Sequence, residues 1–290
     1  MCSVTSETVF VGLDYHAASV QVCVMSEEGK VLMNRSCENS WQAVTGAVRQ
    51  RCGEARVQAA IEACCGAADL ADELISRDWS VNLAHAGYVA RMKQSPDKTD
   101  YSDARMLADL QRVGYLPRVW LAPEEVRELR RLGRYRQSLA KERKTLKLQI
   151  GATLREVRQK APSNANPWTK AWLAWVDQSA KLSPNARHIT TRRLQRLTAL
   201  AEEIRQVEKR LEQQTREDPL VQKLLTVKGI GIVTAATLRA EIGRFDRFRN
   251  GKQLARFCGL SPRNASSGER QADAGLIKAG NPELGALLVE

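Results

Sequence analysis

The spacing of hydrophobic residues divides the chain into two parts. In the first part, short apolar runs alternate with polar turns, which is typical of a domain that contains a sheet. Residues 9–13 form a continuous apolar run that ends on Asp14, residues 20–24 alternate with a period of two, and residues 31–33 follow a polar turn. These three runs predict three strands joined as an antiparallel meander.

Helices and single strands then alternate. Helical spacing covers residues 40–51 and 67–77, whereas apolar runs at 57–61 and 80–83 predict strands, and the first of these runs ends on Glu62. Three strands followed by alternating helices and strands predict an α/β layer with a mixed sheet.

The second part of the chain has the spacing of long helices. One helix is predicted over residues 124–160, where Leu132, Leu139 and Leu146 recur every seven residues, and another over residues 186–216. The second helix carries apolar residues at alternating intervals of three and four, at Leu197, Leu200, Ile204, Val207 and Leu211. Such stripes are typical of an antiparallel helical hairpin or a dimerising coiled coil, and equally of two amphipathic helices packed on a globular core.

Two shorter motifs accompany the long helices. Residues 168–180 predict a helix with a tryptophan stripe at Trp168, Trp172 and Trp175, which core packing explains better than base stacking does. Near the C-terminus, Lys228-Gly229-Ile230-Gly231 separates two helical stretches. This is the helix-hairpin-helix pattern, whose turn amides can bind a nucleic-acid phosphate, although two glycines between helices are also common as helix caps.

Charge adds a candidate partner. The chain has 45 Lys and Arg against 33 Asp and Glu, a net charge of +12 and a pI near 9.6. Residues 1–120 hold 12 basic and 15 acidic side chains, so the basic excess lies in the remainder, and residues 127–160 alone hold 12 basic against 3 acidic. A polyanion, such as a nucleic acid, is the expected partner of the second part.

Other classes of protein are disfavoured. Seven cysteines without a CxxC pair, together with three histidines, argue against a zinc site or a secreted disulfide framework. No apolar stretch approaches the ~20 residues of a membrane span, and no signal peptide opens the chain. We therefore expect a cytoplasmic protein.

Four carboxylates fall where a metal site needs them. Asp14 and Glu62 end two strands that can lie side by side in the sheet, and Asp100 and Asp103 begin a helix predicted to run to about residue 114. Clustered carboxylates repel one another unless a cation is bound, and oxygen ligands favour Mg²⁺ or Mn²⁺. Taken singly, each could simply cap a turn or a helix. His16 could assist at this site, but a surface or turn histidine is the preferred interpretation.

The chain resembles a known family in three regions. The segments VGLDYH, AAIEACCG and KTDYSDARMLADL in the first part, and VKGIGIVTAATLRAEIGRFDRF, KQLARFCGLSPRNASSG and KAGN in the second, resemble the DEDD insertion-sequence transposases. The resemblance implies an α/β plus all-α architecture. An RNase H-like (RuvC-like) catalytic domain would occupy residues 1–120, a basic helical coiled-coil segment 121–217, and a C-terminal transposase domain with a helix-hairpin-helix 218–290.

The resemblance also implies a mechanism. Asp14, Glu62, Asp100 and Asp103 match the metal-binding tetrad of the family, which would hold two Mg²⁺ or Mn²⁺ ions. Ser267 matches the serine that attacks the DNA phosphate, with Ser266 as the neighbouring alternative. The implied partners are donor and target DNA, a structured guide RNA (bridge RNA), and further copies of the chain in a dimer or tetramer.

The residues expected to contact nucleic acid lie in the second part of the chain. They are Arg130, Arg131, Arg134, Lys141, Lys228, Gly229, Gly231, Arg263, Arg270 and Lys278. Two other functions stay open at this point: a RuvC-like, structure-selective nuclease that uses activated water, and an inactive nucleic-acid-binding remnant. Family members usually carry Leu-Arg after the Gly-Asn pair, whereas Leu284-Gly285 follows here, so a shortened C-terminal domain is expected.

Overall fold

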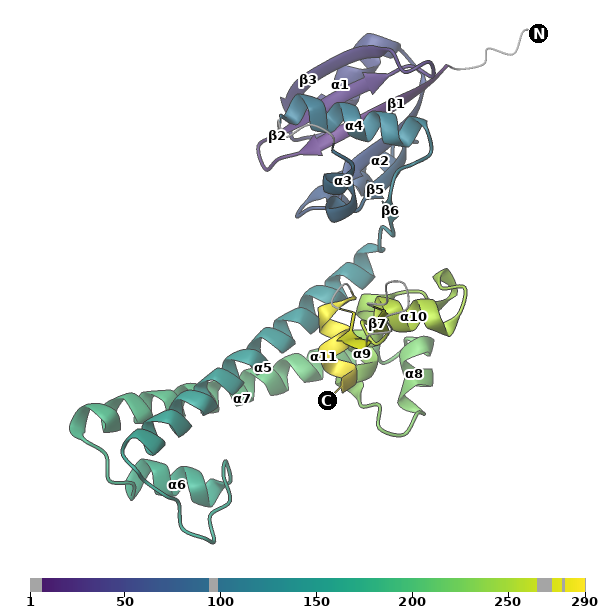
Figure 1. The fold of residues 1–290 in the computed structure, drawn as a ribbon. Helices are drawn as coiled ribbons and strands as arrows, with labels where there is room; N and C mark the ends of the chain where they lie inside the picture. The colour runs from purple at the N-terminus through teal and green to yellow at the C-terminus, as the bar shows by residue number, and fades with distance from the viewer. Residues whose placement is uncertain (1–6, 94–98, 265–272, 278–279, 290) are drawn as a thin grey trace. The chain divides into compact units, whose positions relative to one another are not determined.

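The fold is that of a computed structural model, which describes residues 7–93, 99–264, 273–277 and 280–289. It divides into two compact units, residues 1–121 and 122–290. The first unit holds a large sheet and the second is mainly helical (Figure 1). Each unit is described by itself below.

The first unit is built on a six-stranded mixed sheet with the order β3-β2-β1-β4-β5-β6. Strands β1 to β3 form an antiparallel meander, β4 and β5 run parallel to β1, and β6 is antiparallel to β5. The strands are Thr8–Tyr15 (β1), Ser19–Met25 (β2), Val31–Glu38 (β3), Arg56–Glu62 (β4), Ser80–Ala84 (β5) and Arg118–Val119 (β6). The predicted meander and the two later strands are confirmed. The sequence did not predict β6, whose two residues pair with the edge of the sheet.

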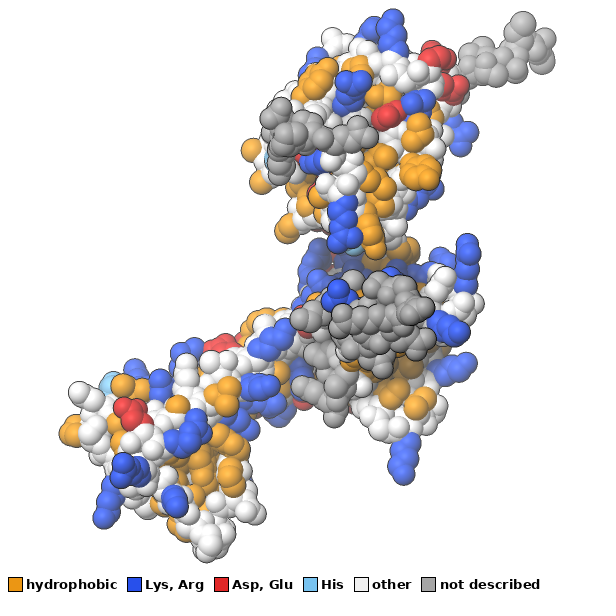
Figure 2. Space-filling view, viewed as in Figure 1, with side chains coloured by type: hydrophobic (Ala, Val, Ile, Leu, Met, Phe, Trp, Pro, Cys, Tyr) orange, Lys and Arg blue, Asp and Glu red, His pale blue; other side chains and the backbone are white. Residues whose placement is uncertain are grey.

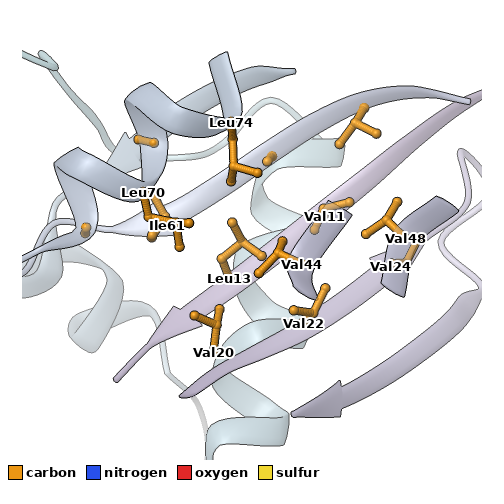
Figure 3. Packing of buried hydrophobic residues seen from close by; sticks show 14 of the residues in the cluster. Val11, Leu13, Val20, Val22, Val24, Val44, Val48, Ile61, Leu70 and Leu74 are labelled. Carbon is orange, nitrogen blue, oxygen red and sulfur yellow. The ribbon is translucent and has the colours of Figure 1, made fainter. Parts of the chain in front are cut away.

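Helices cover both faces of this sheet. On one face, α1 (Trp41–Cys52) and α2 (Ala67–Ile75) pack against the central strands, and Leu13, Ile61 and Leu74 are fully buried between them (Figure 3). Each such side chain contributes about 1.5–3 kcal/mol relative to exposure to water. The other face is covered by α4 (Asp100–Arg112), and α3 (Ala86–Met92) lies before α4 in the chain.

The second unit begins with a long helical hairpin. Helices α5 (Glu124–Glu156) and α7 (Pro184–Thr215) are antiparallel, since Arg136 of α5 bonds to Glu208 of α7 and Glu142 bonds to Arg196. The leucine stripes predicted from the sequence face one another in a common core: Leu139, Leu146, Leu197, Leu200, Ile204, Val207 and Leu211 are all buried there. Of the arrangements left open by the sequence, the structure therefore has the hairpin within one chain.

Shorter elements complete the second unit. They are α6 (Lys170–Gln178), α8 (Pro219–Leu225), α9 (Ile232–Ile242), a 3₁₀ turn η1 (Phe245–Arg247), α10 (Gly251–Phe257), β7 (Pro262–Asn264), β8 (Asp273–Leu276) and α11 (Pro282–Val289). Helix α9 packs on both long helices, with Ala236 and Ala240 in the same core as the leucine stripes. Helices α8 and α9 flank the predicted glycine turn, where Gly229 has a φ of +93° that favours glycine.

Candidate active site

The ends of β1 and β4 bring two carboxylates to the same edge of the sheet. Leu13 pairs with Ile61 in the parallel β1–β4 ladder, so Asp14 and Glu62 each lie one residue beyond that pair. Side chains at matching positions of parallel strands point to the same face. Gly12, two residues before Asp14, shows that this is the face covered by α4.

Gly12 sets the position of α4 on the sheet. A Cβ atom added there would lie 1.9 Å from the backbone oxygen of Ala104 and 2.5 Å from the backbone nitrogen of Ala108, so α4 sits directly on the glycine. Asp100 lies one turn before Ala104 on the same side of the helix. The close approach therefore carries the first turn of α4 to the end of β1.

The first turn of α4 is also a stable place for acidic residues. Thr99 and Ser102 form a capping box, in which the hydroxyl oxygen of each residue accepts a hydrogen bond from the backbone N–H of the other. The capped N-terminus fixes where the helix begins, and the positive end of the helix dipole stabilises Asp100 and Asp103. The sequence prediction that these acids open a helix is confirmed.

Two of the predicted carboxylates meet around a histidine. The His16 Nε2 atom lies 3.3 Å from Oδ2 of Asp14 and 3.3 Å from Oδ2 of Asp100. One ligand atom from each of the three residues lies within 4.8 Å of the others, a spacing at which they could hold one metal ion. His16 was expected to be a surface or turn residue. It is half-exposed, but it lies at the centre of this group.

Asp103 is more deeply buried than Asp100 and has its own cationic partner. Its side chain is buried, with a relative exposure of 7%, and one of its oxygens lies 2.6 Å from the ammonium nitrogen of Lys93. Position 103 points inward because it is one turn before the fully buried Leu107, whereas Asp100 stays exposed. Lys93 had no distinguishing signal in the sequence, since it lies ten residues from its partner.

Asp14 is partly buried and lies among other acidic groups. Burial raises the pKa of its carboxyl above the ordinary value, the neighbouring His16 lowers it, and the charges of Asp103 and Asp100 raise it again. A group of carboxylates that oppose one another's ionisation is a favourable environment for a divalent cation. The oxygen donors with one imidazole nitrogen fit Mg²⁺ or Mn²⁺, and Asp14, Asp100 and His16 are the residues best placed to hold such an ion.

The loop after Glu62 packs closely against Tyr15, the residue that follows Asp14. Gly66 has a φ of +90°, and a Cβ atom there would lie 2.2 Å from the hydroxyl oxygen of Tyr15. Burial and the charge of Glu62, with a smaller effect of Asp14, raise the pKa of the Cys64 thiol. Glu62 thus lies at the same edge as the other acids, although it is outside the three-residue group among the described residues.

The second unit contains the remaining predicted residues. Ser266, Ser267, Arg270 and Lys278 lie outside the described residues, and Arg263 is exposed on β7. A close backbone contact joins Gly259, which precedes β7, to Gly280, which follows β8. A Cβ atom on Gly280 would lie 2.3 Å from the Cα atom of Gly259.

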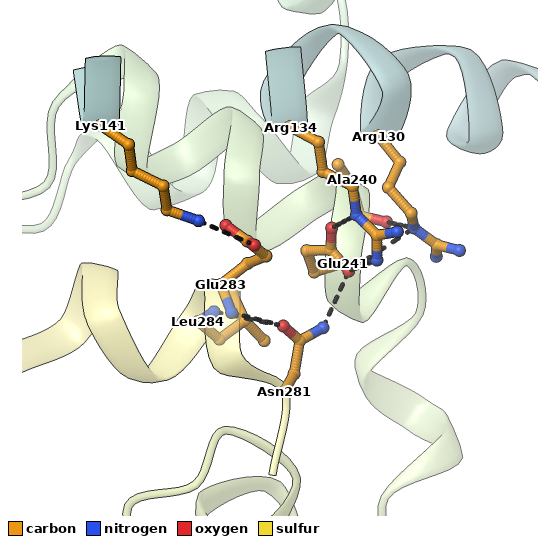
Figure 4. A network of polar contacts seen from close by, with 8 residues as sticks. All are labelled: Arg130, Arg134, Lys141, Ala240, Glu241, Asn281, Glu283 and Leu284. Carbon is orange, nitrogen blue, oxygen red and sulfur yellow. Dashed lines mark hydrogen bonds and ion pairs between the residues drawn. The ribbon is translucent and has the colours of Figure 1, made fainter. Parts of the chain in front are cut away.

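Two of the arginines expected to bind nucleic acid are joined to a buried carboxylate instead. Arg134 donates two hydrogen bonds to Glu241, at 2.8 and 3.0 Å, and Arg130 lies 3.6 Å from the same side chain, which is only 4% exposed (Figure 4). Asn281 donates a further hydrogen bond of 2.8 Å to Glu241. These contacts join α5, α9 and the residue that precedes α11, so Arg130 and Arg134 each have a partner within the protein.

The other two basic residues predicted on α5 have exposed side chains. Arg131 is paired with Glu124 and Glu128 on its own helix, while Lys141 is 71% exposed and lies 3.4 Å from Glu283. Lys228 and Gly229 are exposed at the glycine turn, and Gly231 caps α9. No described residue of the chain belongs to a helix that is long and apolar enough to cross a membrane.

Comparison with known proteins decides the family. Residues 11–159, just over half of the chain, match a DEDD transposase family, and residues 221–290 match the transposase family of IS116, IS110 and IS902. The chain belongs to the IS110 family of DEDD transposases. The first match includes all four predicted carboxylates, and the second includes Ser267.

Individual relatives agree with this assignment. The transposase for insertion sequence element IS1328 of Yersinia enterocolitica is 28% identical over 231 residues, which are 80% of this chain and 68% of the relative. The transposase for IS1111A of Coxiella burnetii is 24% identical over 280 residues, 96% of this chain and 75% of the relative. A Sinorhizobium fredii relative is 31% identical over 193 residues, 67% of this chain and 47% of its own length. The IS110-family chain thus spans between about half and three quarters of these relatives.

Proposed function

We propose that this IS110-family chain cuts and rejoins DNA at the edge of the sheet where Asp14, Glu62, Asp100 and Asp103 lie. The observation that carries the proposal is the convergence of Asp14 and Asp100 on His16, where burial and then the charges of Asp103 and Asp100 raise the pKa of Asp14. When bound, one or two Mg²⁺ or Mn²⁺ ions would neutralise that charge and polarise a DNA phosphate. The protein's part is to fix the carboxylates, which α4 does by packing on Gly12.

Ser267 is the proposed nucleophile. Its hydroxyl oxygen would form a bond to phosphorus while the bond from phosphorus to a deoxyribose oxygen breaks, which leaves a phosphoserine link that a second DNA end can resolve. The support is its match to the family motif and its place in the matched C-terminal segment. Arg263 and Arg270, near in sequence, would bind the phosphate oxygens.

The proposed partners are donor DNA, target DNA, a structured guide RNA and further copies of the chain. The support for nucleic acid is the basic excess of the second part of the chain, together with the family membership. Exposed basic groups such as Lys141 and Lys228 would hold the sugar-phosphate backbone largely without reading its sequence.

A covalent-trapping experiment tests the chemistry. The full chain, its guide RNA and an end-labelled DNA substrate would be incubated with Mn²⁺ and denatured, and labelled protein–DNA adducts would be counted. Ser267→Ala should abolish the adduct, and Ser266→Ala should retain it. Asp14→Asn should abolish both adduct and cleavage with no loss of folded structure.

Each of the other functions predicts a different result. Undiminished strand cleavage by Ser267→Ala, with no adduct from the parent protein, would show a nuclease that uses activated water. Nucleic-acid binding without cleavage in either metal would show an inactive remnant.

A further inference from the structure

A cavity lies within the second unit, among α5, α6 and α7. Its volume is about 580 Å³, within the range of small-molecule sites. Trp168, Leu173, Leu194 and Leu197 supply apolar walls. Figure 2 shows hydrophobic side chains exposed among lysines and arginines over this end of the helical hairpin. The sequence predicted that the tryptophan stripe packs in a core. Trp172 is buried, as that prediction requires, whereas Trp168 is only partly buried and lines the cavity.

The backbone at Trp168 is held in an uncommon conformation. Its φ is +70°, and the carbonyl of Asn166 accepts a hydrogen bond of 3.2 Å from the N–H of Thr169, with Pro167 between them. This is the pattern of a type II turn, in which the position of Trp168 normally belongs to glycine. A bulky aromatic residue there is strained by about 1–3 kcal/mol, and such strain clusters at binding sites.

Cations without acidic partners border the same cavity. Arg143 and Lys147 are one turn apart on α5 and both line it, and the Lys147 ammonium lies 5.0 Å from the centre of the Trp168 ring. Among the described residues, no carboxylate lies within ion-pairing distance of either cation. The acid that lines the cavity, Asp177, accepts a hydrogen bond of 3.4 Å from Thr191 instead.

We propose that this cavity binds one base of a single-stranded nucleic acid, stacked on Trp168, with the adjoining phosphates held by Arg143 and Lys147. An indole face accepts any base, and unpaired cations one turn apart match successive phosphate charges. A protein partner, including a second copy of the chain, would have to bring carboxylates that pair with both cations. The site requires neither the metal cluster nor Ser267, so it stands apart from the proposed chemistry.

Binding of labelled ten-nucleotide strands to the full chain in EDTA tests the site. Oligothymidylate and oligouridylate would be compared by fluorescence anisotropy, which separates a DNA-binding from an RNA-binding cavity. Trp168→Ala should weaken binding of at least one strand about tenfold or more, because base stacking on an aromatic side chain is lost. Trp168→Phe should bind within about threefold of the parent.

Two further variants protect the test against misfolding. Arg143→Ala with Lys147→Ala should weaken binding and reduce its salt dependence, whereas Arg205→Ala with Lys209→Ala removes two charges from one turn of α7 outside the cavity and should do neither. Photocrosslinking of 4-thiouridylate should label Trp168. Equal binding by the parent, Trp168→Ala and Arg143→Ala with Lys147→Ala would overturn the proposal. So would a change of oligomeric mass in these variants without a change in binding, which would make the cavity a protein interface.

Discussion

Lys93 neutralises Asp103 from within the protein: its ammonium nitrogen lies 2.6 Å from a carboxylate oxygen that is almost entirely buried. The pair joins the end of α3 to the first turn of α4, the helix that carries two of the four predicted metal ligands. A buried carboxylate with a single strong partner depends on that partner for its charge. Lys93 is therefore an internal counter-cation at the candidate active site.

The first prediction removes this counter-cation. Lys93→Met should lower the stability of the metal-free protein by about 1–3 kcal/mol, because Asp103 is left buried and charged without a partner. Mn²⁺ should bind the variant more tightly than the parent and restore part of the stability, which thermal unfolding with and without MnCl₂ would measure. Lys30→Met, at an exposed turn of the same unit, is the control and should change neither quantity. A variant as stable as the parent without metal would contradict the assigned role.

The second prediction concerns the pH dependence of Asp14. Folding raises the pKa of Asp14 above its ordinary value near 3.8, mainly because the group is buried. Below pH 3.8 the Asp14 carboxyl is protonated in both the folded and the unfolded protein, so it does not lower the free energy of unfolding. As the pH rises through the folded-state pKa, ionisation in the folded protein costs stability. Asp14→Asn should therefore be more stable than the parent at pH 7 in EDTA, and the difference should shrink on acidification towards pH 4.

Melting temperatures between pH 3.5 and 7.5 would measure this effect. Glu54→Gln, at a side chain that is 84% exposed, is the matched control and should show no such pH-dependent gain. Addition of Mn²⁺ should favour the parent and reverse the order at pH 7, because only the parent keeps the full ligand set. If the Asp14→Asn protein is less stable than the parent in EDTA at pH 7, the ionised Asp14 does not destabilise the folded protein.

The sequence predicted the strands and helices of the site better than its side-chain contacts. Hydrophobic spacing identified the strand ends at Asp14 and Glu62, since a buried strand in this fold is a continuous apolar run. The strand β6 was missed because two residues are too few to show any period. Spacing along a helix also placed Asp100 and Asp103 in the same first turn of α4, but it could not show that Asp100 contacts His16 while the buried Asp103 contacts Lys93.

Charge runs could not show which basic residues have partners within the protein. Arg130 and Arg134 lie in the most basic stretch of the chain, which predicted a nucleic-acid surface, and both also pair with Glu241, which lies more than 100 residues later in the sequence. A long-range partner leaves no trace in local composition. The same limit applies to Trp168, whose stripe with Trp172 and Trp175 predicted packing, while its positive φ is visible only in the structure.

The third prediction tests how α4 is positioned. Gly12→Ala should destabilise the protein by about 3 kcal/mol or more and weaken Mn²⁺ binding, because the added methyl would collide with backbone atoms of α4 that cannot rotate away. Gly46→Ala is the matched control. Nothing lies within 4 Å of its added methyl in α1, and replacing glycine inside a helix should stabilise by about 0.5–1 kcal/mol. Denaturant unfolding and metal titration would measure both effects, and a Gly12→Ala protein with unchanged metal affinity would separate the ligand geometry from this contact.

The fourth prediction distinguishes structural from nucleic-acid-binding arginines. Glu241→Ala should destabilise the second unit by about 2–5 kcal/mol, because Arg130 is left partly buried without its carboxylate and Asn281 loses an acceptor. Arg130→Ala with Arg134→Ala should be similarly destabilising, since Glu241 is then buried and charged without a cation. Glu202→Ala, which breaks an ion pair with Arg205 on the exposed face of α7, should leave stability unchanged and serves as the control.

Urea unfolding and the salt dependence of DNA binding would be measured on the same proteins. If Arg130 and Arg134 are structural, folded protein that lacks both should keep the parent slope of log K against log salt. Lys141→Gln, at a side chain that is 71% exposed, should reduce that slope by up to about 0.9. A stable double variant with a reduced slope would return Arg130 and Arg134 to the binding surface. Stability and salt slope therefore separate the cations that hold α5 to α9 from those that hold nucleic acid.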